Sequence, residues 1–398
     1  MNGNGLEGYK VIDLTHYVSG PYCTRLMAGV GMEVIKVEKP GEGDGARCMG
    51  PFVNDEPDIE KSIPALFLNA NKKSITLNLK TSQGRDIFLE LIKGADILVE
   101  NFMPRVMPSL GLDYETLRGL NPALVMTSIS NFGQSGPYRD YEASEIVEYA
   151  LSGLMYITGT PEATPLKLGL DVSQQVAAQY AFMATLAALY SREMTGEGDY
   201  VDVSIMECNT GLLDWQLGLL LGLDFIYKRL GDLNQKGHPW GVFSCQDGWV
   251  CVCAIGGNFK YVTEMVGDPR LRDPKFMTSA GRLENRDEVS SLLLPWLVEH
   301  TREDIFHALC TKPSCAGGMV LNTEEIVNCP QLNSRNFFYQ VEHPEAGKAL
   351  YPKGPFQMSE IPWKEGRAPL LGEYNDEVYS KLGYSKAELV QLRQLNVI

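Results

Sequence analysis

The sequence has few of the patterns that mark disulfide-rich or metal-binding proteins. Its nine cysteines include no C-x-x-C pair, and its five histidines form no H-x-x-H or H-E-x-x-H cluster. An odd number of unevenly spaced cysteines argues against a disulfide framework and favours a reducing, cytoplasmic location. Cys251 and Cys253 alternate within the strand-like run WVCVCAIG, which predicts buried thiols. Zinc sites need closely spaced Cys and His ligands, so no metal site is expected.

Basic charge and long apolar runs are also scarce. The chain has 35 Lys and Arg against 50 Asp and Glu, a formal charge of −15 that argues against binding to nucleic acid or to an anionic membrane. The start, MNGNGLEGYKVIDLT, lacks the basic run and apolar stretch of a secretory signal. Residues 211–223 are largely apolar but include Asp214 and are too short to span a bilayer, which favours a buried helix.

Nucleotide-binding glycine motifs are missing as well. There is no Walker phosphate loop and no G-x-G-x-x-G. The glycines of AGVGME follow a predicted helix, whereas a dinucleotide fingerprint has its glycines before the helix. A dinucleotide cofactor is therefore not expected.

What the sequence does contain is an alternation of predicted strands and helices. With 398 residues, 44% of them hydrophobic, the chain is long enough for two globular domains. The predicted strands are residues 10–14, 33–37, 74–79, 96–99 and 124–129, and the helices between them are residues 19–27, 81–93 and 114–118. Such alternation predicts a parallel sheet with helices on both faces. Residues 39–51 are rich in glycine and charge and are expected to form a loop.

The pattern changes further along the chain. Residues 172–192 predict a helix whose many alanines allow close packing. From about residue 230, antiparallel strands joined by a turn at residues 246–248 are expected, followed by helices at 259–266, 289–300 and 302–309. We therefore predict a smaller α+β domain at residues 230–325, preceded by a large domain at 1–229. Residues 326–398, ending in a helix at 386–395, are expected to return to the large domain.

Eight segments carry a resemblance to a known family. In chain order they are SGPYCTRLMAGVGMEVIKVEKPGEGD, NKKSITLNLKTSQG, VENFMPRVMPSLGLDYETL, SISNFGQSGPY, LSGLMYITGTPEATPLKLGLD, SREMTGEGDYVDVSIMEC, GVFSCQDGWVCVCA and GEYNDEVYSKLGYS. Together they resemble the family III CoA-transferases, which include formyl-CoA:oxalate, carnitine and bile-acid CoA-transferases and share a fold with α-methylacyl-CoA racemases. The resemblance implies a Rossmann-like parallel α/β domain built from both chain ends, a smaller middle domain, and two chains interlocked as a dimer.

The resemblance also implies a nucleophile. Asp171, in LGLDVSQQVAA, lies where the family has an aspartate that attacks the acyl-CoA thioester. A carboxylate is ionised at neutral pH, so no general base is required. Asp171 could instead cap the helix that follows it, and the amides of that helix start could stabilise an oxyanion. Many relatives have glycine where Gln174 and Gln175 stand here, which affects the expected shape of the substrate.

Contacts to coenzyme A are likewise expected from the resemblance. Lys39 would face the phosphates, Leu77 and Lys80 the adenine, and Asn101 and Phe102 the pantetheine arm, with Val18 beside the reacting carbonyl, Arg105 as a further basic candidate, and Gly256 and Gly257 in a loop over the active site. Lys39 and Lys80 could equally be solvated surface lysines, Phe102 a core residue, and the glycine pair a plain turn. Oxalate-specific relatives have glutamine at the position of Val18, which argues against oxalate here.

The expected reaction moves CoA from a succinyl-CoA-like donor to a carboxylic acid, with no permanently bound cofactor. Aryl-substituted and dicarboxylic acids are the candidate acceptors. Two alternatives remain open at this point. A CoA-dependent racemase needs proton-transfer groups, typically a histidine before the SG segment, and only Glu145 and Glu148 are available there. The chain could also be one subunit of a heteromer, since some relatives pair an active chain with a sister lacking the aspartate.

Overall fold

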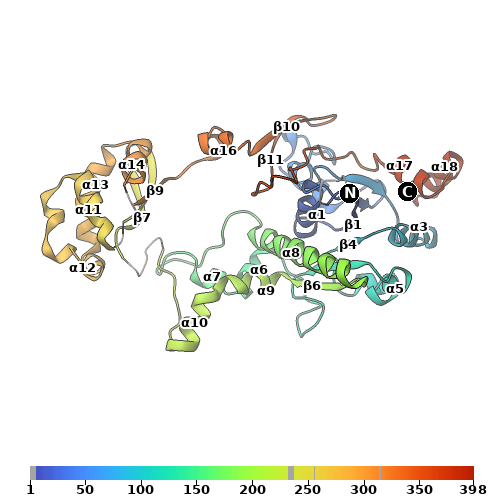
Figure 1. Cartoon of the computed structure of the whole chain (residues 1–398), viewed down its shortest axis with the longest axis horizontal. Helices are drawn as coiled ribbons and strands as arrows, with labels where there is room; N and C mark the ends of the chain where they lie inside the picture. The colour runs from blue at the N-terminus through green and yellow to red at the C-terminus, as the bar shows by residue number, and fades with distance from the viewer. Residues whose placement is uncertain (1–5, 232–236, 255, 313–314) are drawn as a thin grey trace. The chain divides into compact units, whose positions relative to one another are not determined.

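The computed structural model describes residues 6–231, 237–254, 256–312 and 315–398. The chain forms two compact units (Figure 1). Unit 1 consists of residues 1–154, 167–218 and 331–398, and unit 2 of residues 155–166 and 219–330. Unit 2 includes residues 155–166, which the sequence pattern did not indicate.

Unit 1 is built on a parallel sheet of six strands in the order β3-β2-β1-β4-β5-β6. The strands are β1 Lys10–Leu14, β2 Glu33–Glu38, β3 Lys73–Thr76, β4 Ile97–Glu100, β5 Val125–Ser130 and β6 Tyr200–Ser204. The predicted parallel α/β fold is confirmed. Strand order reverses between β1 and β4, and in open sheets of this kind ligands bind beyond the carboxyl ends of the strands at that reversal.

Helices cover both faces of the sheet. The helices of this unit are α1 Ser19–Gly29, α2 Ile63–Leu68, α3 Ser82–Lys93, α4 Val106–Ser109, α5 Tyr114–Leu120, α6 Glu145–Leu151, α8 Val172–Thr195 and α9 Ile205–Thr210. The short helix α7 Leu154–Ile157 begins the first segment of unit 2. Successive residues of β1 enter different cores, because side chains alternate across a strand: Val11 packs in a core with α1 and α8, and Ile12 in a core with α3 and α5. The long helix α8 lies along α1, β5 and β6 (Figure 1).

The C-terminal segment packs within this unit. It contains α16 Pro330–Ser334, the hairpin β10 Phe338–His343 with β11 Gly347–Pro352, and helices α17 Asn375–Lys381 and α18 Lys386–Gln394. The hydroxyl of Tyr379 donates to the Thr76 carbonyl at 2.6 Å, which attaches α17 to the end of β3. Residues more than 300 positions apart therefore share one core.

Unit 2 is an α+β unit with an antiparallel sheet in the order β7-β8-β9. Its strands are β7 Trp240–Cys245, β8 Gly248–Cys253 and β9 Ala316–Met319, and its helices include α11 Phe259–Val266, α12 Ser279–Glu284, α13 Arg286–Val298, α14 Arg302–Cys310 and α15 Thr323–Val327. The predicted hairpin around residues 246–248 is present, with β7 paired antiparallel to β8.

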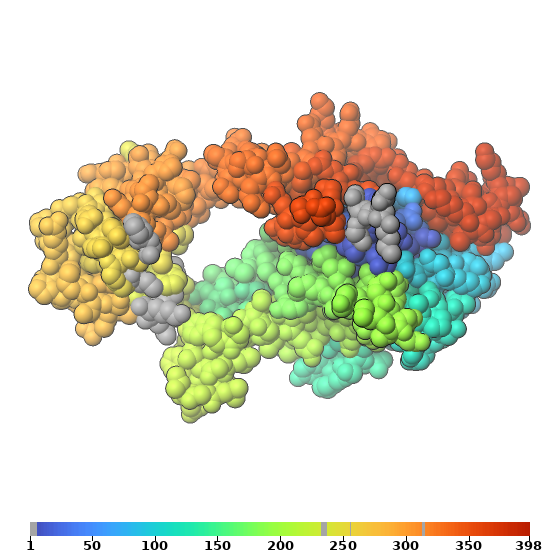
Figure 2. All heavy atoms as spheres, in the orientation of Figure 1, coloured from blue at the N-terminus to red at the C-terminus, as the bar shows by residue number. Residues whose placement is uncertain are grey.

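Two burial predictions are wrong. The apolar segment at residues 211–223 was expected to be a buried helix, but helix α10 Asp214–Leu223 contains no buried residue, and Leu221 is 87% exposed. Figure 2 shows this segment, in yellow-green, on the surface. The apolar residues of α10 are distributed around the whole helix rather than on one face. Packing against one surface of the same chain would therefore leave part of them exposed. Cys251 is exposed because side chains alternate along β8: its neighbours Val250 and Val252 face the core of unit 2, so Cys251 faces the opposite side of the sheet.

No helix among the described residues is long and apolar enough to cross a membrane.

Candidate functional site

Four of the predicted site residues follow the carboxyl ends of adjacent strands. Val18 comes after β1, Lys39 directly after β2, Leu77 directly after β3, and Asn101 directly after β4. Because β3, β2, β1 and β4 are neighbours in the sheet, these residues lie along one edge. The pair from β1 and β4 flanks the reversal of strand order, where this type of sheet binds ligands.

Asn101 joins the two sides of this edge. Its Oδ1 accepts from the His16 amide at 2.7 Å, and its Nδ2 donates to the His16 carbonyl at 2.8 Å. The ring of Phe102 lies 5.1 Å from that of His16 and packs against the core below. The amide of Phe102 donates to the buried Glu100 carboxyl at 2.8 Å, and burial raises the pKa of Glu100 to about 7. The segment after β4 is thus fixed to the loop after β1.

A buried ionic network supports that loop from below. Lys36 of β2 lies 2.9 Å from Asp44, and Lys72 lies 2.9 Å from Asp13 of β1, with all four side chains removed from solvent. Burial alone would raise the pKa of Asp13, but Lys36 and Lys72 hold it well below its ordinary value. Asp44 also accepts the Tyr17 amide at 2.9 Å. Moving one partner out of this network would leave an unpaired buried charge, which is strongly destabilising. The network therefore holds the loop after β1 in place.

Val18 is only 8% exposed and packs in a small apolar cluster. The cluster consists of Val18, Ala46, Ala65 and Leu68, with Tyr22, Met49 and Phe67 at its border. At the next position but one, Gly20 allows α1 to approach the loop closely, because a Cβ there would lie 2.3 Å from that of Thr15. The surroundings of Val18 are therefore apolar and closely packed.

Asp171 lies immediately before α8, but it does not cap the helix. Its side chain makes no capping hydrogen bond. Instead, Glu145 at the start of α6 accepts from the amides of Ser173 at 3.0 Å and Gln174 at 3.3 Å. The capping alternative is thus wrong for Asp171, since another carboxylate satisfies those amides. The same contacts contradict the expectation that these amides are available to an oxyanion.

A second glutamate extends this arrangement. Glu148 is fully buried, and Gln174 Nε2 donates to its Oε2 at 2.7 Å. Asn131, which follows β5, donates to Glu148 Oε1 at 2.9 Å in the amide orientation that satisfies both groups. Burial, with smaller contributions from Glu145 and Asp171, raises the pKa of Glu148 to about 7. These contacts attach the start of α8 to the carboxyl end of β5, on the same edge as Asn101.

Replacing Glu148 with glutamine is expected to stabilise the protein increasingly as pH rises. Between pH of about 4.5 and 7 the folded chain retains a proton on Glu148 that the unfolded chain has lost, so wild-type stability falls across this window. The full difference corresponds to about 3 kcal/mol in the free energy of unfolding. Urea denaturation of both proteins at pH 5 and pH 8 measures it, with the exposed Glu142→Gln as control. A gap that does not change with pH would show that Glu148 is ionised throughout.

The side chains of the other residues predicted to contact CoA differ in their solvent exposure. Lys39 is 56% exposed in its side chain and pairs with Glu42 at 2.7 Å. Lys80 and Arg105 are exposed. The side chain of Leu77 is 3% exposed and belongs to the core between the sheet and α3, so it presents no open surface to a ligand.

The predicted glycine pair lies in unit 2. Gly256 and Gly257 follow β8 and begin a short helical turn before α11. Gly256 has φ +61, a left-handed conformation that favours glycine, and no heavy atom lies within 4 Å of a Cβ built at either position. The pair therefore forms an open turn at the surface of its unit.

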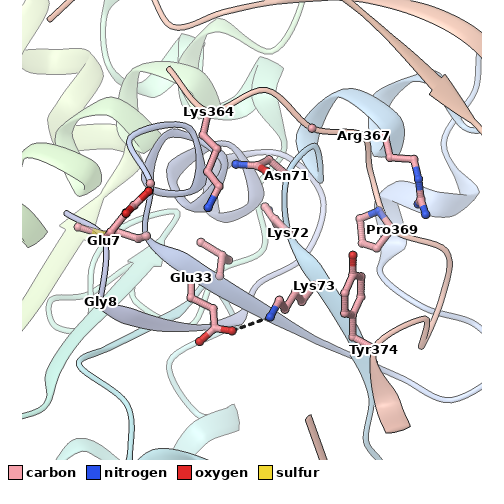
Figure 3. Close-up of a pocket in the computed structure, with 14 residues that line it drawn as sticks. Glu7, Gly8, Glu33, Asn71, Lys72, Lys73, Lys364, Arg367, Pro369 and Tyr374 are labelled. Carbon is pink, nitrogen blue, oxygen red and sulfur yellow. Dashed lines mark hydrogen bonds and ion pairs between the residues drawn. The ribbon is translucent and has the colours of Figure 1, made fainter. Parts of the chain in front are cut away.

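A cavity of about 670 Å³ lies at the opposite edge of the unit 1 sheet, around the amino ends of β2 and β3. Figure 3 shows Glu33 paired with Lys73 at 2.7 Å on its floor, with Lys364 and Asn71 above them. None of the predicted site residues lines it. Its basic side chains are mostly paired with acids, such as Arg367 with Glu373, so it has little free charge for an anion.

Among the described residues, no group of three or more His, Cys, Asp and Glu side chains could hold a metal ion. Two contacts at the start of α8 were not predicted from the sequence: Glu145 accepts the first amides of the helix, and Asn131 donates to Glu148. The two glutamates of EIVEYAL are three positions apart, which places them on one helical face and could have indicated the first contact.

Comparison with known proteins gives consistent matches over the whole chain. The model of CoA-transferase family III matches residues 6–375. A formyl-CoA:oxalate CoA-transferase from Streptomyces avermitilis is 35% identical, over 99% of each chain. A succinyl-CoA–D-citramalate CoA-transferase from Chloroflexus aurantiacus is 30% identical, over 99% of this chain and 98% of the other. The crystal structure of a CAIB/BAIF family protein from Brucella suis superposes with a TM-score of 0.87 at 28% identity, covering 96% of this chain and 100% of that one.

Proposed function

Because this chain belongs to CoA-transferase family III, and is therefore an enzyme that transfers coenzyme A, we propose that Asp171 is its covalent nucleophile. The observation that carries the proposal is the carboxylate of Asp171 at the start of α8, which makes no capping hydrogen bond and has no side-chain partner among the described residues. Glu145 already satisfies the neighbouring amides, so Asp171 has no structural hydrogen bond to lose when it reacts. The α8 start is linked through Glu148 to the same sheet edge as Asn101.

The proposed reaction has four balanced steps. An Asp171 oxygen attacks the thioester carbonyl of the donor and the C–S bond breaks. CoA departs as the thiolate, and a mixed anhydride forms between Asp171 and the donor acid. The thiolate then attacks the aspartyl carbonyl and releases the donor acid as its carboxylate. The acceptor carboxylate attacks the resulting aspartyl–CoA thioester and again releases thiolate. Attack of that thiolate on the acceptor carbonyl forms the new acyl-CoA and frees Asp171.

Residues at the carboxyl edge of the sheet would bind the thioester. We assign the pantetheine arm to Asn101 and Phe102, which are fixed by His16 and Glu100, and the reacting carbonyl to the region of Val18. Lys39 is an exposed cation that can meet the phosphates of CoA. Lys80, proposed for the adenine end, and Arg105, a further basic candidate, are also exposed. Gly256 and Gly257 would form the loop that covers the bound substrates.

Hydroxylamine trapping tests the nucleophile directly. Incubation of the pure protein with acyl-CoA donors and hydroxylamine is expected to leave a hydroxamate on Asp171, located by peptide mass spectrometry. Succinyl-CoA is the first donor to test, together with formyl-CoA and acetyl-CoA. An enzyme that transfers CoA while its Asp171 peptide stays unmodified would refute this role.

For the acceptor we propose a carboxylic acid larger than oxalate, dicarboxylic or aryl-substituted. The names of the relatives include oxalate and citramalate as acids. Val18 itself has no group that can hydrogen-bond the second carboxylate of oxalate, whereas oxalate-specific relatives have glutamine at this position. A panel of acids of increasing length, assayed with one donor, tests this choice.

Asn101→Ala is expected to raise KM for the acyl-CoA about tenfold or more, because two hydrogen bonds that fix the loop after β1 would be lost. Steady-state kinetics at saturating acceptor measures the change. Asn121→Ala is a suitable control: its side chain makes two hydrogen bonds to backbone carbonyls at the opposite end of the strands. Equal effects from both variants would mean that Asn101 acts only through stability.

We further propose that two chains associate, as an interlocked homodimer or with a related subunit. Helix α10 supports this, because its leucines and Trp215 are exposed within one chain, and monomers rarely expose contiguous apolar patches of this kind. A heteromer would make this chain the subunit that carries Asp171. Assay of the purified chain without any other subunit distinguishes the two arrangements. A homodimer is expected to transfer CoA by itself, whereas a heteromer would need the related subunit.

A further inference from the structure

A second cavity, of about 570 Å³, lies within unit 2 beside the glycine turn. It is lined by Gly256, Gly257, Phe259, Lys260, Thr263, Glu264, Arg272, Met277 and Arg282. These residues come from α11, α12 and two short connecting segments. The lining holds three cations and one acid, although the chain as a whole has a net charge of −15.

Arg282 forms the buried wall of this cavity. Its guanidinium donates to the carbonyls of His238 at 2.6 Å, Phe276 at 2.8 Å and Gly256 at 3.2 Å, and lies 4.6 Å from the centre of the Phe259 ring. Its partners are dipoles rather than carboxylates, and no ion pair of Arg282 occurs among the described residues. Burial lowers its pKa, and no acid opposes that effect. Its positive charge is therefore not neutralised, and it also fixes one end of the glycine turn.

Two further cations line the cavity from its exposed side. Lys260 and Arg272 are solvent-exposed, and neither forms an ion pair within the part of the chain that the structure describes. Lys260 lies over the ring of Tyr261, 4.8 Å from its centre, which leaves its charge available. Most other basic side chains of unit 2 are neutralised, such as Lys275 by Glu288 and Arg302 by Glu325. Three cations without an ion pair among the described residues therefore line this cavity, whereas Lys228, Arg229 and Lys312, which also lack one, lie elsewhere in the unit.

We infer that this cavity of unit 2 binds an anionic oxygen group. Two kinds of ligand can supply such a group: a dicarboxylic acid with a carboxylate, or coenzyme A with a phosphate. Either would gain charge-assisted hydrogen bonds from Lys260 and Arg272 over a wall made positive by Arg282. The inference rests on the proposed function, which makes carboxylic acids and coenzyme A the candidate ligands.

Calorimetric titration tests the subsite without requiring turnover. The wild type and the double variant Lys260→Gln/Arg272→Gln are titrated with succinate, butyrate, CoA and 3′-dephospho-CoA. Arg282 is left in place because it holds the fold, and the exposed Arg286→Gln serves as control. Loss of the cations is expected to weaken one class of anion about tenfold or more, and the control to change none.

The ligand that weakens identifies the source of the anion. A loss for succinate but not butyrate assigns the subsite to the acceptor. A loss for CoA but not its dephospho form assigns it to the ribose phosphate, and a loss for both forms to the diphosphate. Unchanged affinity for all four ligands, equal losses for succinate and butyrate alone, or no binding to the wild type would overturn the inference. Wild-type binding without any CoA transfer would instead refute the proposed function and leave the subsite intact.

Discussion

Asp171→Asn is expected to lower CoA transfer by at least about 10³-fold, because the amide keeps the shape of the side chain but cannot attack a thioester as an anion. Folding should be little affected, since Asp171 makes no capping hydrogen bond and Glu145 holds the first amides of α8. Binding of CoA should likewise be retained. The measurements are kcat with the best donor, the melting temperature, and calorimetric affinity for CoA.

The control for this change is Asp287→Asn, an acid-to-amide substitution at a side chain that is 97% exposed. It should leave all three quantities unchanged. Wild-type turnover in Asp171→Asn would sink the mechanism. A hydroxamate on Glu145 would do so in a more informative way, because Glu145 is the other carboxylate at the α8 start and would then be the nucleophile.

Leu217→Asp combined with Leu221→Asp is expected to abolish dimer formation. The two side chains are 42% and 87% exposed and lie four residues apart, on one face of α10. Burying a leucine contributes about 1.5–3 kcal/mol, and each substitution occurs twice in a twofold-symmetric dimer. Loss of four buried leucines weakens association by about 6 kcal/mol or more, a factor of at least about 10⁴ in Kd.

Sedimentation of the wild type and the variant over a range of concentrations measures this effect. Val390→Asp, at a half-exposed position of α18, introduces the same charge away from α10 and should leave the dimer intact. A variant that still sediments as a dimer would remove α10 from the interface. A monomeric wild type with full activity would refute the interlocked arrangement altogether.

Much of unit 1 could be predicted from local sequence. The strand KVIDL and the helix after Ser19 lie where the pattern placed them, because short apolar strands and helix-start residues are local signals. That Val18, Lys39 and Asn101 lie along one edge of the sheet could also be predicted, because residues that follow parallel strands lie at the same edge. The strand predicted at residues 74–79 was too long, because β3 ends at Thr76 and the side chain of Leu77 packs in the core.

Other features depend on contacts between distant residues. A sequence containing an aspartate before a helix predicts a cap, and only the packing of α6 against α8 puts Glu145 on those amides instead. The burial that raises the pKa of Glu148 arises in the same way. The sequence by itself determined the parallel α/β fold and the family, because alternating elements and ordered motifs are properties of the chain. Tertiary structure decided which carboxylate is bonded, which is buried and which is left free, because burial and hydrogen bonding depend on neighbours far apart in sequence.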